Sequence, residues 1–78
     1  MGHDQFAALM PYIITDLAKM IANKQNLSEK DAIIKLYSSK LYEFLEIEET
    51  KVWHYSTPML YSLLEQEEKT GKIEFPDA

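Results

Sequence analysis

The chain has 78 residues, no cysteine and a formal net charge of −5 at pH 7. Its length allows one small domain. Because it has no cysteine, disulfides, thiolate catalysis and cysteine-based zinc sites are excluded. Residues 29–78 carry all of the excess charge, with eleven acidic side chains against six lysines, and such a surface repels nucleic-acid phosphates. Arginine, the usual bidentate ligand of phosphate and guanine, is absent, which further disfavours nucleotide and sequence-specific DNA binding.

No segment is apolar over the length that a membrane-spanning helix needs. Pro11, Asp16 and Lys19 interrupt the apolar segment 6–21, and no basic region precedes it as in a signal peptide. We therefore expect a cytoplasmic protein with one domain over residues 1–78 and loosely ordered ends at 1–4 and 73–78. The expected fold is all-α, a small bundle of about four helices with an irregular segment near residues 46–56.

The first predicted helix is Gln5–Lys24. Its apolar residues recur at three- and four-residue steps, which is typical of an amphipathic helix, at Phe6, Met10, Ile13, Leu17, Met20 and Ile21. Pro11 leaves two alternatives open, since proline is tolerated in a first turn but removes a backbone hydrogen bond further along. The helix begins near Met10, or it begins near Asp4 and bends at Pro11.

Two further helices are predicted after a connector at residues 23–27. Ser28 is a typical N-cap followed by acidic residues, so we expect a helix over Glu29–Ser38. The pair Ser38-Ser39 interrupts the helical propensity, and a shorter helix is expected over Lys40–Leu45.

The last predicted helix is Pro58–Thr70. Thr57 is expected to cap it, Pro58 suits the first helical position, and Gly71 is a natural stop. Two pairs at four-residue spacing, Glu65 with Lys69 and Glu68 with Lys72, are expected to form salt bridges along it.

The segment 37–61 holds six of the nine aromatic residues and the single tryptophan. Tryptophan and tyrosine are common anchors of protein interfaces, but they also fill cores with their polar ends at the surface. We favour a core position for Trp53 and leave both possibilities open for the tyrosines. The candidate interaction surface is Tyr37, Tyr42, Trp53, His54, Tyr55 and Tyr61.

No catalytic, cofactor-binding or metal-binding residue is predicted. The chain lacks G-x-S-x-G, H-E-x-x-H and any glycine-rich phosphate loop. His54 is the one credible base, with Ser56 and Thr57 nearby, but a half-buried ring beside Trp53 is the favoured interpretation. The acidic run at Glu43, Glu46, Glu48 and Glu49 is interpreted as a solvated face rather than a cation site.

Three segments carry a resemblance to a known family: Ser39-Lys40-Leu41-Tyr42-Glu43, the run from Glu48 to His54, and the run from Glu67 to Lys72. Over residues 27–72 the chain resembles a family of small bacterial proteins of uncharacterised function that share the pattern S-K-x-Y-x-x-L…E-E-T-K-x-W-H-x-S. The resemblance implies a small, mainly helical cytoplasmic protein that acts with the products of neighbouring genes. It implies no active site.

The leading functional hypothesis is a non-catalytic protein–protein interaction module that is able to self-associate. The alternatives are a small ligand- or metal-dependent enzyme centred on His54 and, more weakly, a nucleic-acid-associated regulator that acts through a basic partner. We expect a homodimer through the apolar face of the first helix together with Tyr37, Trp53 and Tyr61, unless the four helices alone enclose these residues.

Overall fold

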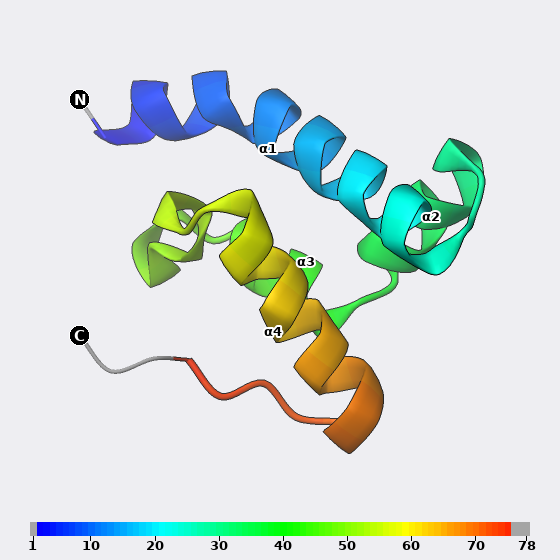
Figure 1. Ribbon diagram of the computed structural model, residues 1–78. Coiled ribbons are helices and arrows are strands. Elements are labelled where there is room, and N and C mark those ends of the chain that lie inside the picture. The colour runs from blue at the N-terminus through cyan, green and yellow to red at the C-terminus, as the bar shows by residue number, and fades with distance from the viewer. Residues whose placement is uncertain (1, 76–78) are drawn as a thin grey trace.

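The computed structural model describes the backbone of residues 2–75 and the side chains of residues 5–47 and 49–75 (Figure 1). Its helices are α1 (Gly2–Gln25), α2 (Glu29–Tyr37), α3 (Lys40–Leu45) and α4 (Thr57–Thr70), and two short 3₁₀ turns, η1 (Glu48–Thr50) and η2 (Val52–His54), join α3 to α4. The prediction of a small all-α domain with an irregular segment before the last helix is confirmed. No helix in this part of the chain has the length and apolar character needed to cross a membrane.

Helix α1 continues through Pro11, so the alternative with an early start is correct, and the helix begins at Gly2 rather than at Gln5. It contacts both α2 and α4 (Figure 1). Leu17 and Ile21 of α1 are fully buried in the core. The chain then reverses at Asn26, whose φ of 55° is left-handed, and leads directly into α2.

Serine residues cap the three later helices. The Ser28 hydroxyl accepts a hydrogen bond from the Asp31 N–H, as the sequence predicts. Ser39 caps α3 in the same way. The predicted cap of α4 is wrong by one residue, because Ser56 accepts from the Met59 N–H and Thr57 is the first helical residue. Gly71 ends α4 with a φ of 78°, which glycine adopts without strain.

The N-terminus of α3 is also capped from α4. The Glu67 carboxylate accepts the backbone N–H groups of Lys40 at 2.8 Å and Leu41 at 3.2 Å. Ser39 accepts the next N–H, that of Tyr42, at 3.1 Å. The first three N–H groups of α3 therefore all have an acceptor, and two of these acceptor atoms belong to one negatively charged side chain at the positive end of the helix.

A polar junction of four side chains ties α1, α2 and α4 together. Gln25 accepts a hydrogen bond from the Lys35 ammonium and donates to the Tyr61 hydroxyl at 3.3 Å and to Glu68 at 3.1 Å. Lys35 also pairs with Glu68 at 2.9 Å. Glu68 thus reaches across to α2, and the predicted pairing with Lys72 is wrong because Lys72 lies beyond the end of α4.

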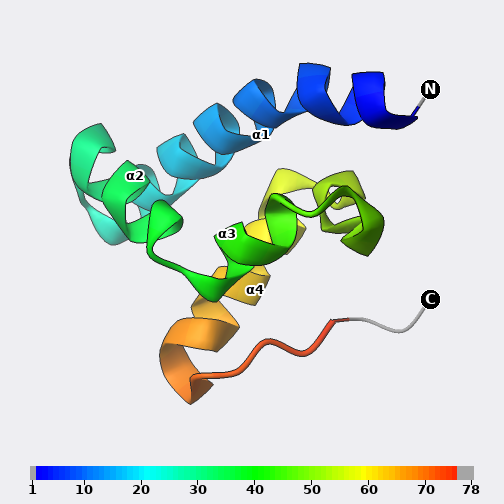
Figure 2. The same ribbon diagram turned by 180° about the vertical axis from the view of Figure 1, so that it is seen from behind.

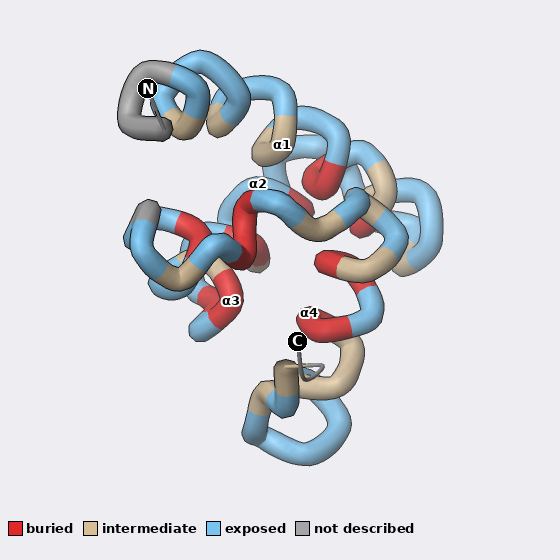
Figure 3. Tube along the Cα trace, turned by 90° about the vertical axis from the view of Figure 1, so that its left-hand side faces the viewer, coloured by how far each residue is buried: buried red, intermediate tan, exposed pale blue. Residues whose placement is uncertain are grey.

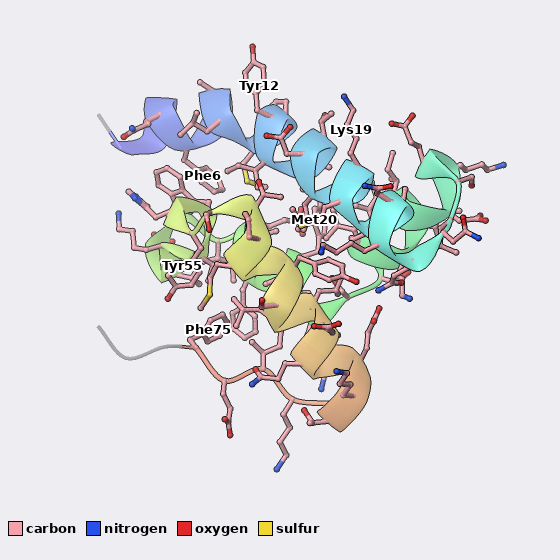
Figure 4. All side chains as sticks on the ribbon, viewed as in Figure 1. Phe6, Tyr12, Lys19, Met20, Tyr55 and Phe75 are labelled. Carbon is pink, nitrogen blue, oxygen red and sulfur yellow. The ribbon has the colours of Figure 1, made fainter. Side chains whose placement is uncertain are left out.

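The core is formed by buried residues of all four helices and of η2, and Figure 3 shows the buried stretches in red. Trp53 is 3% exposed, which confirms its predicted core position. Its ring meets that of Phe6 edge to face, with centroids 5.3 Å apart, and Phe6 lies on the side of α1 that faces the 3₁₀ turns (Figure 4). Trp53 therefore fixes η2 against the N-terminal half of α1.

The chain after α4 turns back along the helices (Figure 2). The Glu74 N–H donates to the Gln66 side chain at 2.8 Å, and the Phe75 ring packs edge to face on Phe44 at 5.0 Å. These contacts hold residues 73–75, which were expected to be a loose end. The rest of that predicted end, residues 76–78, and Met1 lie outside the described residues.

Replacing Trp53 with alanine removes a buried side chain that joins η2 to α1. We expect Trp53→Ala to lower the free energy of unfolding by about 3–5 kcal/mol, enough to unfold a domain of this size. Thermal unfolding followed by circular dichroism measures it, with Tyr12→Ala as the control because Tyr12 is 71% exposed. An unchanged melting temperature for Trp53→Ala contradicts the core role.

Replacing Glu67 with alanine leaves the Lys40 and Leu41 N–H groups without their acceptors. Hydrogen bonds to a charged group contribute more than neutral ones, so we expect a loss of about 1–3 kcal/mol in urea unfolding. Glu65→Ala removes a carboxylate from the same helix and is the matched control. Equal losses for the two variants rule out a specific role for the Glu67 cap.

Candidate functional site

An open groove of about 640 Å³ runs between α1 on one side and α2 with the start of α3 on the other. Its lining is mostly apolar and consists of Ala7, Met10, Pro11, Ile14, Thr15, Ala18, Glu29, Ile33, Tyr37 and Tyr42. We call it the α1–α2 groove. Two smaller hollows lie along α1 and α4 and share Met20 and Lys24. The α1–α2 groove is the candidate site because its apolar walls include two exposed large side chains, Ile33 and Tyr37.

The groove arises because the core uses only part of the apolar surface of α1 and α2. On α1 the fully buried positions are Leu17 and Ile21, while Ile14 beside them is only partly buried. On α2, Ala32 and Leu36 enter the core. The next residues along the chain, Ile33 and Tyr37, point about 100° further around the helix. Ile33 is therefore 37% exposed and Tyr37 is 52% exposed.

Two tyrosine rings form one wall of the groove. Tyr37 at the end of α2 and Tyr42 on α3 have ring centroids 4.6 Å apart. Tyr42 is partly buried. Burial raises the pKa of Tyr42 above its ordinary value of 10.0, and the neighbouring Glu46 and Tyr37 raise it further. Tyr42 therefore stays neutral at physiological pH.

Pro11 contributes a backbone feature to the opposite wall. Proline has no N–H, so the carbonyl of Ala7, four residues earlier in α1, does not receive its usual helical donor. Ala7 and Pro11 both line the groove and both are exposed. Pro11 therefore removes one backbone hydrogen bond from the part of α1 that lines the groove.

The six residues of the predicted interaction surface do not form one surface. Tyr37 and Tyr42 line the groove, whereas Trp53 and Tyr61 are buried in the core, and the Tyr61 hydroxyl belongs to the polar junction. Tyr55 is half-buried against the core. His54 is exposed, and its ring lies 4.1 Å from that of Trp53; it was expected to be half-buried.

Sequence reasoning missed most of the α1 wall and the Ile33 and Glu29 positions of α2. The available signal was the width of the apolar arc of the first helix, which exceeds what one neighbouring helix covers. The sequence predicts a dimer contact for the whole apolar face of the first helix. The part of this face that lies against α2 depends on the crossing angle between α1 and α2, which the sequence does not specify.

Ser56 and Thr57, which follow His54 in the chain, form the start of α4. The Ser56 hydroxyl accepts the Met59 N–H as the α4 cap, and Thr57 is the first residue of that helix. Among the described side chains, no three histidine, aspartate or glutamate groups come together as a metal site. Glu43, Glu46 and Glu49 of the acidic run are exposed to solvent.

Comparisons with protein-family models, with curated proteins and with solved structures find no match to this chain. The resemblance to a family of small bacterial proteins stays a prediction. The candidate site therefore rests on the geometry of the groove.

The raised pKa of Tyr42 predicts a specific loss of stability in alkali. The folded state keeps this phenol protonated to higher pH than the unfolded chain does. Its contribution is therefore complete below the unfolded pKa of about 10 and is lost as the pH rises through the folded pKa. We expect the unfolding free energy of Tyr42→Phe, measured in urea, to fall less above pH 10 than that of the native chain. Equal pH slopes contradict the prediction.

Proposed function

We propose that the protein is a non-catalytic protein–protein interaction module and that the α1–α2 groove is its binding surface. The observation that carries the proposal is the exposed apolar wall of the groove, with Tyr37 half-exposed at the end of α2 beside the exposed edge of Ile33. Exposed apolar side chains that line a concave surface usually mark an association site, and tyrosine is a frequent anchor of such sites.

The frame around the groove supports a binding role. The polar junction holds α1 and α2 to α4, and the Glu67 cap holds α3 to α4. The walls are therefore fixed before a partner arrives. A preformed surface loses little conformational entropy on binding, which favours affinity.

Self-association through the first helix remains a prediction. Two residues that motivated it, Trp53 and Tyr61, are enclosed by the helices of a single chain. Tyr37 is exposed in the groove, whereas the exposed residues Leu9 and Tyr12 of α1 lie outside its lining, and Tyr12 points away from the rest of the molecule (Figure 4). Light scattering at low micromolar concentration tests the homodimer. A mass near 9.1 kDa means a monomer and contradicts it.

Co-purification from native cells tests the interaction function. We expect a defined protein, identified by mass spectrometry, to be retained by the native chain and by Tyr12→Ala and to be lost with Tyr37→Ala. The two variants make the same change at two exposed tyrosines, inside and outside the groove. If Tyr37→Ala folds normally and retains every partner that the native chain binds, the groove is not the binding surface.

A further inference from the structure

We propose that the α1–α2 groove binds an amphipathic helix of another protein, with lysine or arginine side chains flanking its apolar stripe. This inference rests on the proposed interaction function and names the chemistry of its partner. The shape of the groove, the charge at its edges and the charge of the whole chain each contribute to it.

The shape of the groove fits a helix. Its α1 wall runs from Ala7 to Ala18, a rise of about 17 Å or three helical turns. Small side chains, Ala7, Thr15 and Ala18, make up much of this wall and allow the backbone of a ligand to approach closely. Met10 and Tyr37 supply larger apolar contacts. Helices that bind in such grooves anchor themselves through apolar residues at steps of three and four.

The charge in the groove lining is negative. Glu29, the first residue of α2, is its only charged lining residue. Tyr37 lies about 12 Å further along α2, with the Tyr42 ring beside it. A ligand with cationic side chains flanking its apolar stripe complements the Glu29 carboxylate and the negative charge of the whole chain.

A second copy of this chain fits the groove less well. Each copy has a net charge of −5, so two copies repel each other at long range. The groove lining contains no lysine that offsets this repulsion. A positively charged partner is attracted by the negative electrostatic field of this chain, and this attraction increases its association rate.

Fluorescence anisotropy with labelled peptides of about 16 residues, long enough for four turns, tests the inference. The first peptide has a leucine and alanine stripe flanked by lysines, the second replaces each lysine with glutamate, and the third has the composition of the first with the stripe broken. We expect the first to bind, and the other two to bind at least about tenfold more weakly at low salt. Added salt should weaken the first complex.

Variants of the protein locate the binding site. We expect Tyr37→Ala to weaken binding of the lysine peptide about tenfold or more. Glu29→Gln should weaken it about two- to fivefold, as for a solvent-exposed ion pair. Tyr12→Ala and Glu49→Gln make the same changes at exposed positions outside the groove and should leave the affinity unchanged. Circular dichroism melting confirms that each variant is folded.

Several results overturn the inference: no binding of the lysine peptide, equal binding of the glutamate or broken-stripe peptide, or equal effects of the groove and control variants. A dimer in light scattering that Tyr37→Ala dissociates shows that a second copy occupies the groove. One result separates this inference from the proposed function: the lysine peptide does not bind, but an identified native partner is retained by Tyr12→Ala and lost with Tyr37→Ala. The protein is then an interaction module, and the proposed class of partner is wrong.

Discussion

Two adjacent carboxylates on α4 hold the arrangement of the other helices. Glu67 caps the start of α3, while Glu68 binds Lys35 of α2 and Gln25 of α1. A domain of this size without disulfides has a small core and a net free energy of unfolding of only about 3–5 kcal/mol. The hydrogen bonds of the Glu67 cap and of the polar junction therefore contribute a larger share of the stability here than in a large protein. The groove depends on these hydrogen bonds, because its walls are α1, α2 and the beginning of α3.

The groove itself is apolar surface that the core does not use. Helix α1 has more apolar positions than α2 and α4 cover, and α2 exposes Ile33 and Tyr37 next to its buried residues. Exposed apolar side chains that gather in one groove are typical of association sites. The Glu29 carboxylate at its edge supports the proposal that the ligand is basic.

Much of the fold follows from local chemistry that the sequence displays. The predicted bounds of Lys40–Leu45 agree with α3, and Ser28 and Gly71 mark helix ends as expected. The errors come from tertiary contacts. Glu68 has Lys72 at favourable sequence spacing, yet it pairs with Lys35 because α4 ends before Lys72. Of the predicted surface residues only Tyr37 and Tyr42 reach the groove, since composition alone does not distinguish a buried aromatic ring from an exposed one.

The position of α4 in the chain has a consequence for synthesis on the ribosome. The carboxylates that cap α3 and tie α1 to α2 come from the last helix, so they are translated after every group that they bind. Until residue 68 leaves the exit tunnel, the start of α3 lacks the Glu67 cap, and α1 and α2 lack their connection through Glu68. We infer that the groove acquires fixed walls only when α4 emerges and docks.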